Sequence, residues 1–178
     1  MPIADDWSIN YATKQIYQAN WKDEITGTSA SVAEIQTVLC LAASSITTGD
    51  YFYLWSAKDE TAYYVWYNKN SGGGDPAPTG KTGIEVAIGT SDTNIQVASA
   101  TVTAIGSANF SKDFTTANGG TATVTITNKS LGSCTNALDV NTGFTFAVTT
   151  SGKGETVFSV NALYSYLQDT FDELGQMD

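Results

Sequence analysis

Residues 49–68, GDYFYLWSAKDETAYYVWYN, carry eight aromatic rings in two short segments on either side of a polar turn. Aromatic and β-branched residues favour strands, whereas Ser, Asp and Glu are common between them. The pattern therefore predicts two neighbouring strands, at 49–58 and 62–69. Large apolar side chains fall on both faces of each strand, which is typical of central strands that are covered on both sides.

The rings on these two strands have two interpretations. Buried, they form part of the core; exposed, they form a platform that stacks on a sugar or docks a protein. Trp55 and Trp66 are the candidate ligand-stacking residues under the second interpretation. The presence of rings on both faces favours burial.

Further strands and one helix are predicted around this pair. Alternation and β-branched content indicate strands at 34–42, 84–88, 110–115, 122–127 and 144–149, the third and fourth joined by an Asn118-Gly119-Gly120 turn. Ser91 or Asp92 can cap a helix that ends at Gly106 and whose apolar stripe is Ile95, Ala98, Val102 and Ile105. The sequence thus predicts an α+β fold, a mixed, mainly antiparallel β-sheet domain with one covering helix, an N-terminal hairpin and a C-terminal amphipathic helix.

The chain divides into four predicted parts. Residues 1–19 form a hairpin or docking segment, 20–33 a linker, 34–152 an inserted β-rich domain, and 153–178 a C-terminal strand and amphipathic helix. The apolar stripe of that helix either packs in the core or contacts a partner, and its acidic residues face solvent or a partner. The candidate interface residues are Leu163, Leu167, Phe171, Leu174, Trp7 and Tyr11. Whether the chain continues beyond Asp178 stays open.

Composition excludes several classes of function. The net charge is −10 with only 8 Lys and Arg, so no basic surface is expected to bind nucleic acid. The chain has no histidine, which removes the commonest general base and zinc ligand. No apolar run is long enough for a membrane span, and no signal peptide opens the chain. Cys40 and Cys134 are expected to be two buried thiols, with a disulfide as the alternative.

The stretch 72–86, GGGDPAPTGKTGIEV, contains a Gly-Lys-Thr that resembles a phosphate-binding loop. The loop would need a glycine at position 75, which is Asp75, and a helix after it, whereas IEVAI predicts a strand. Pro76 and Pro78 would also remove amide donors. We therefore expect a long polar connection between strands, in which Lys81 is a solvent or subunit contact.

Catalytic chemistry is not predicted. The adjacent carboxylate pairs, such as Asp59 and Glu60, fall in predicted turns or at a helix end, where solvated charges are common. No calcium-binding loop is present in the sequence. We expect no catalytic residue, no metal and no cofactor.

Several segments resemble a domain of minor structural proteins from tailed bacteriophages: EIQTV from Glu34, GDYFYLWSAKDETAYYVWYN, DPAPTGKTGIEVAI, SDTNIQVASATVTAI, and NTGFTFAVTTSG to Gly152. The flanks ADDWSINYATKQIYQ and VFSVNALYSYLQDTFDELGQMD are similar to the opening of phage virion proteins. The resemblance implies a virion structural component, assembled in the host cytoplasm, that docks on other virion proteins and on copies of itself. It belongs to a tail, baseplate or fibre-anchoring module; the alternatives are a capsid decoration protein and a carbohydrate- or receptor-binding module on a fibre.

Overall fold

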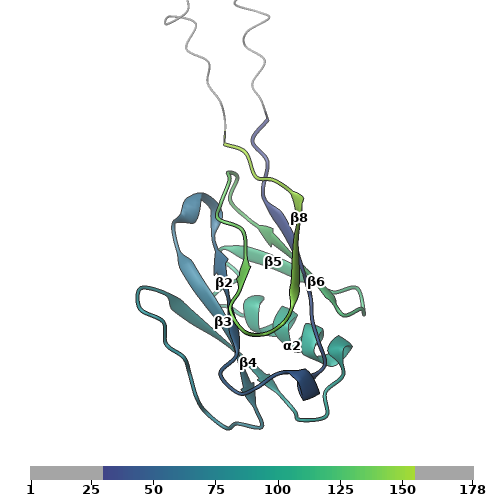
Figure 1. Ribbon diagram of the computed structural model, residues 1–178. Coiled ribbons are helices and arrows are strands. Elements are labelled where there is room, and N and C mark those ends of the chain that lie inside the picture. The colour runs from purple at the N-terminus through teal and green to yellow at the C-terminus, as the bar shows by residue number, and fades with distance from the viewer. Residues whose placement is uncertain (1–29, 155–178) are drawn as a thin grey trace, which may run out of the picture. The chain divides into compact units, whose positions relative to one another are not determined.

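Two four-stranded sheets and one α-helix make up residues 30–154, the part of the chain that the computed structural model describes (Figure 1). The elements in chain order are β1 (Ile35–Leu39), η1 (Ala43–Ser45), β2 (Tyr51–Trp55), η2 (Ala57–Asp59), β3 (Ala62–Lys69), β4 (Thr82–Ile88), α2 (Asn94–Ile105), β5 (Phe114–Ala117), β6 (Thr123–Asn128), β7 (Leu138–Asp139) and β8 (Thr145–Thr150). η1 and η2 are short 3₁₀ helices. The predicted hairpin at 1–19 and the predicted terminal helix lie outside the described residues.

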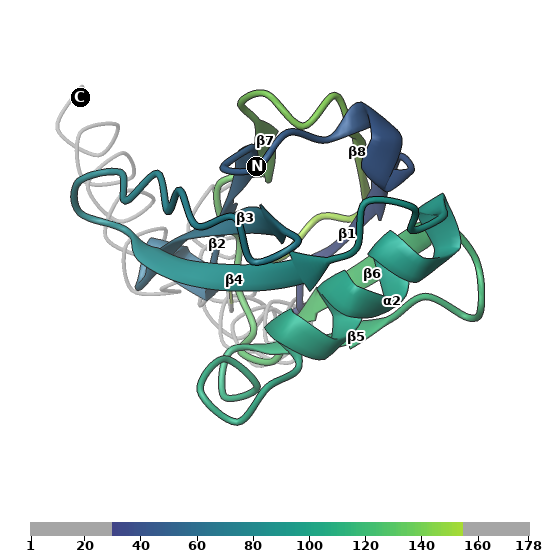
Figure 2. The ribbon, with the colours of Figure 1, turned by 90° about the horizontal axis from the view of Figure 1, so that it is seen from below.

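The two sheets differ in their strand directions. The first sheet has the order β5-β6-β1-β8 and is antiparallel throughout. The second has the order β4-β3-β2-β7, in which β3 and β4 are parallel and the other pairs antiparallel. Helix α2 packs against β4 of one sheet and β5 and β6 of the other, so it bridges them along one side (Figure 2). The predicted α+β, mainly antiparallel class is confirmed, with two sheets where the sequence indicated one.

The hydrophobic core lies between the sheets and beneath the helix. It contains Phe52 and Leu54 of β2 together with the inward side chains of β3, β4, β6 and α2. Both faces of β3 are buried from Tyr63 to Tyr67, as its sequence predicts. The same prediction is wrong for β2, whose outward side chains stay partly exposed, because the described residues leave that face of the strand incompletely covered.

Helix α2 begins later than predicted, and its buried face includes Ala98 and Ile105 of the predicted stripe but not Ile95. Thr93 is its cap: the Thr93 side chain accepts from the Gln96 backbone, and Gln96 accepts from the Thr93 backbone. The helix ends at Gly106, as predicted. Ile95 is exposed, whereas Thr101 lies on the buried face, because its hydroxyl donates to the Val97 carbonyl (2.8 Å).

Two further differences concern short elements. The strand predicted at 110–115 begins only at Phe114, because the backbone N–H groups of Asp113 and Phe114 donate to the Phe110 carbonyl in a turn. Strand β7 was not predicted, since two residues give no measurable alternation. The predicted Asn-Gly-Gly turn does join β5 and β6, with positive φ at Gly119 and Gly120.

Cys40 and Cys134 are both free thiols, the first buried and the second half-buried. Within residues 30–154 no helix is long and apolar enough to cross a membrane.

Candidate functional site

The outward face of β2 carries a row of three partly exposed aromatic side chains, Tyr51, Tyr53 and Trp55. The ring centroids of Tyr51 and Tyr53 are 5.4 Å apart at an interplanar angle of 71°, and those of Tyr53 and Trp55 are 5.8 Å apart at 56°. Such edge-to-face and tilted contacts are the favourable arrangements of aromatic pairs. Phe52 and Leu54 alternate with the row and point into the core, so the backbone that presents the rings is fixed from behind.

Strand β7 and the residue after it add two exposed aliphatic side chains to this row. Leu138 lies opposite Tyr53 in the strand register and is 57% exposed. Val140 is 43% exposed, and its backbone N–H donates to the Tyr51 carbonyl (3.3 Å). We refer to Tyr51, Tyr53, Trp55, Leu138 and Val140 as the aromatic surface.

Two aromatic side chains of β3 share this face of the sheet but are covered. Trp66 pairs with Tyr51 and Tyr64 pairs with Tyr53 in the register of β2 and β3. Trp66 is only 6% exposed, and Tyr64 is also buried. The Tyr64 hydroxyl donates to Asp75 Oδ1 (2.8 Å), which brings the connection between β3 and β4 over the ring.

This connection, residues 70–81, is hereafter the crossover loop. Because β3 and β4 are parallel, the chain must return along the sheet before it can enter β4. Asp75 Oδ1 also accepts from the Ala77 backbone (2.9 Å), and Ala77 has a positive φ of 41°. Pro76 and Pro78 are half-buried between exposed neighbours. The Tyr64–Asp75 hydrogen bond therefore pins the loop to the sheet.

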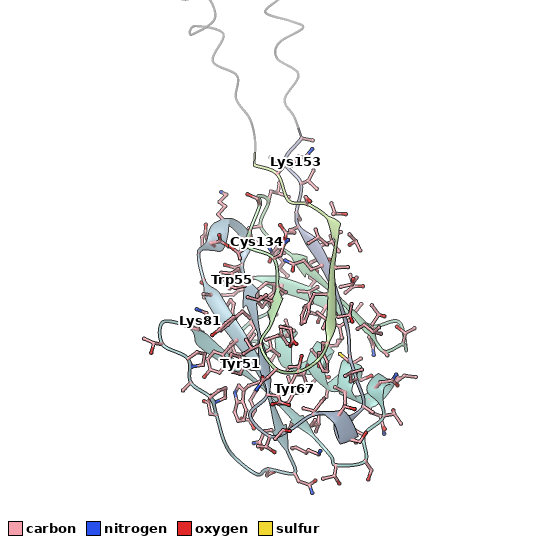
Figure 3. All side chains as sticks on the ribbon, in the orientation of Figure 1. Tyr51, Trp55, Tyr67, Lys81, Cys134 and Lys153 are labelled. Atoms are coloured by element: carbon pink, nitrogen blue, oxygen red, sulfur yellow. The ribbon has the colours of Figure 1, made fainter. Side chains whose placement is uncertain are left out.

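Lys81, at the end of the crossover loop, borders the aromatic surface. Its Nζ lies 4.6 Å from the centroid of the Tyr53 ring, a cation–π contact. Figure 3 shows Lys81 at a height between Tyr51 and Trp55, on the same side of the molecule. Strand β4 begins directly after it at Thr82, so Gly-Lys-Thr leads into a strand and not into a helix N-terminus, as predicted.

The pKa values of the Tyr51 and Tyr64 phenols are raised, so both groups are uncharged at neutral pH. Burial, followed by the hydrogen bond to Asp75, raises the pKa of Tyr64 to about 12. The pKa of Tyr51 is also raised, chiefly by its hydroxyl contact with Tyr53 (3.5 Å). The aromatic surface thus offers apolar area, ring faces and neutral hydroxyl groups, which suits stacking and docking.

The sequence-predicted site residues fall into two groups. Trp55 belongs to the aromatic surface, whereas Trp66 lies on the same sheet face but is buried. The predicted interface residues lie outside the described residues: Leu163, Leu167, Phe171, Leu174, Trp7 and Tyr11. Leu138 and Val140 were not among the predicted site residues, because a strand of two residues gives no measurable alternation from which to select them.

Among residues 30–154, no three His, Cys, Asp or Glu side chains gather where they could hold a metal ion. Protein-family models and curated proteins give no match to this chain. Function is therefore inferred from the chain's own residues and geometry.

Proposed function

We propose that this chain is a structural component of a tailed-phage virion that docks by protein–protein contacts in a symmetric, multi-copy assembly. The resemblance of residues 34–152 to phage structural proteins supports the class. The aromatic surface supports docking as the mode of action, and it is the observation that carries the proposal. A tail, baseplate or fibre-anchoring module is the favoured place, and a capsid decoration protein is the alternative in the same class.

The make-up of the aromatic surface is that of an interface centre. Tyr and Trp are enriched at the centres of interfaces and carry much of the binding energy there. Here the rings are held by one another and by a rigid strand, so little side-chain freedom remains to be lost on docking. Leu138 and Val140 enlarge the apolar area beside them.

Charge also favours this surface for contact with an acidic neighbour. The chain has a net charge of −10, so two copies repel each other when their acidic surfaces come together. The five residues of the aromatic surface carry no formal charge at neutral pH. Contact through such a surface avoids placing like charges opposite each other.

Incorporation into particles tests the proposal. Virus particles purified from cells that carry the source genome should contain the wild-type chain after a high-salt wash. Trp55→Ala and Leu138→Asp should reduce incorporation at least about fivefold, because each removes roughly 1–3 kcal/mol of docking energy. Ile95→Asp, at an exposed position of α2, is the matched control and should incorporate normally. Absence of the chain from particles, or normal incorporation of both surface variants, would contradict the proposal.

A glycan-binding module is the second candidate, because partly exposed Tyr53 and Trp55 rings can stack on sugar faces. A glycan array with the wild-type chain and Trp55→Ala separates the two. Binding that is lost in the variant supports the glycan role, and an array without signal for the wild-type chain counts against it.

A further inference from the structure

A polar cluster that is not part of the aromatic surface lies where the chain enters β1. It contains the buried side chains of Glu34, Gln36 and Asn128 and the half-buried Cys134, which belongs to the loop between β6 and β7. Figure 3 shows Cys134 at the same end of the domain as Lys153. The proposed docking through the aromatic surface does not involve the residues of this cluster.

The carboxamide of Gln36 is held from both sides. Its Oε1 accepts from the Ala137 backbone N–H (2.6 Å), and its Nε2 donates to Glu34 Oε1 (2.6 Å). The same Nε2 lies 3.7 Å from Cys134 Sγ. A thiol therefore stands beside an amide whose carbonyl oxygen already receives a strong backbone donor.

The sulfur is held as closely as the amide. Asn128 Nδ2 donates to Cys134 Sγ (3.1 Å), and the Cys134 backbone N–H donates to Glu34 Oε2 (3.2 Å). Asn128 is only 4% exposed, and its Oδ1 has no hydrogen-bond partner. A buried amide left half-satisfied and directed at a thiol is an arrangement that packing alone does not require.

We propose that Cys134 and Gln36 react to form an internal thioester. Sγ attacks Cδ of Gln36, a C–S bond forms, the C–N bond breaks, and ammonia leaves. The thiol proton passes through the Glu34 carboxylate to the departing nitrogen, so atoms and charge balance without an oxidant, metal or cofactor. The product ties β1 to the loop before β7.

Each neighbour has a role in this reaction. The Ala137 N–H donates to the oxygen on which negative charge develops, as an oxyanion-stabilising donor does. Glu34 is within hydrogen-bond reach of the Gln36 nitrogen and serves as base and then as acid. Asn128 positions the sulfur.

The state of the thiol explains why a base is needed. Burial, and then Glu34 beside it, raises the pKa of Cys134 to about 12, so the group is a protonated thiol at neutral pH. The attacking species is a thiolate, which requires an adjacent acceptor for the proton. Cys40 also has a pKa raised to about 12 by burial, but its hydrogen-bonding neighbour is the Thr101 hydroxyl, so it provides an internal comparison.

Intact mass of the denatured full-length chain at mildly acidic pH tests the proposal. We expect the wild-type mass to be lower than calculated by one ammonia, with one titratable thiol where the sequence has two cysteines. Methylamine should restore the second thiol and become attached at Gln36, as peptide mapping will show. Cys40→Ala should keep the ammonia loss, whereas Cys134→Ala and Gln36→Ala should have their full calculated masses.

The decisive readout comes from the wild-type chain, so poor folding of a variant does not remove it. A glutamate found at position 36 in the wild-type chain but not in Cys134→Ala would mark a hydrolysed thioester and also supports the proposal. A full calculated mass with two thiols and an intact glutamine at position 36 would overturn it.

Discussion

The hydroxyl groups of Tyr67 and Thr101 lie 2.8 Å apart between strand β3 and helix α2, and both residues are fully buried. Thr101 donates its own hydroxyl proton to the Val97 carbonyl (2.8 Å). Because a hydroxyl group has one proton, Tyr67 must be the donor in the bond between the two side chains. In the hydrogen bond that joins β3 to α2, Tyr67 is therefore the donor and Thr101 the acceptor.

Because Tyr67 is the donor, removing its hydroxyl and removing the Thr101 hydroxyl should lower the free energy of unfolding by different amounts. Tyr67→Phe removes the donor and leaves Thr101 bonded to Val97, so we expect a loss of about 1 kcal/mol in the free energy of unfolding. Thr101→Val leaves the Tyr67 hydroxyl buried without an acceptor and should lose more, about 2–3 kcal/mol. Urea unfolding measures both. Thr103→Val, which removes a similar but exposed bond to Ser99, is the control and should change little; equal losses for the two buried variants would contradict the assignment.

Stability should fall at alkaline pH. Burial raises the pKa of Tyr67 well above its ordinary value of 10.0 and that of Tyr63 to about 12. The unfolded chain therefore releases these protons at lower pH than the folded chain does, so unfolding becomes more favourable as pH rises. The stabilisation from the two phenols is complete below pH 10 and is lost as pH rises through the folded pKa values; the buried Cys40 thiol, whose pKa has an ordinary value of 9.0, begins the fall slightly earlier.

Urea midpoints measured from about pH 8 to about pH 11 check this expectation. Tyr67→Phe should flatten the fall, because the phenol with the strongest burial is then absent. A midpoint that stays constant or rises over this range would contradict it.

Local sequence signals predicted the elements well. The strand at β3 follows from its β-branched and aromatic content, and the turn at Gly119 and Gly120 follows from the need for positive φ. The end of α2 at Gly106 was also predicted. These features depend on residues close together in the chain.

The pairing of strands and the burial of their outward side chains could not be predicted from local sequence signals. Strand β1 pairs with β6 and β8, which come much later in the chain, and no local pattern specifies such partners. Trp55 and Trp66 illustrate the consequence for the site. Both point to the same face of the sheet, yet Trp66 is only 6% exposed whereas Trp55 stays partly exposed, and alternation along a strand does not specify what covers its face.

Asp75 should control how firmly the crossover loop stays on the sheet. It accepts hydrogen bonds from the Tyr64 hydroxyl and the Ala77 backbone, so Asp75→Ala removes both at once. We expect trypsin to cleave after Lys81 about tenfold faster in this variant, since local opening becomes easier by roughly 1.5 kcal/mol. Cleavage after Lys112 serves as the internal reference.

Asp75→Asn is the matched variant for this experiment, because its side-chain oxygen can still accept from Tyr64 and Ala77. It should be cleaved after Lys81 at nearly the wild-type rate. If Asp75→Ala were as resistant as Asp75→Asn, the loop would be held by its other contacts and Asp75 would not be the pin.

Gly83 leaves no room for a side chain beside the buried ring of Tyr64. It lies beside Tyr64 in the parallel register of β3 and β4, and a Cβ there would be 2.5 Å from the Tyr64 hydroxyl oxygen. The ring cannot simply swing away, because its hydroxyl is bonded to Asp75. We expect Gly83→Ala to lose about 1–3 kcal/mol in urea unfolding through overpacking. Gly154→Ala, where a Cβ has no atom within 4 Å, should stay close to wild type, and a Gly83→Ala chain as stable as that control would show that Tyr64 can leave Asp75 freely.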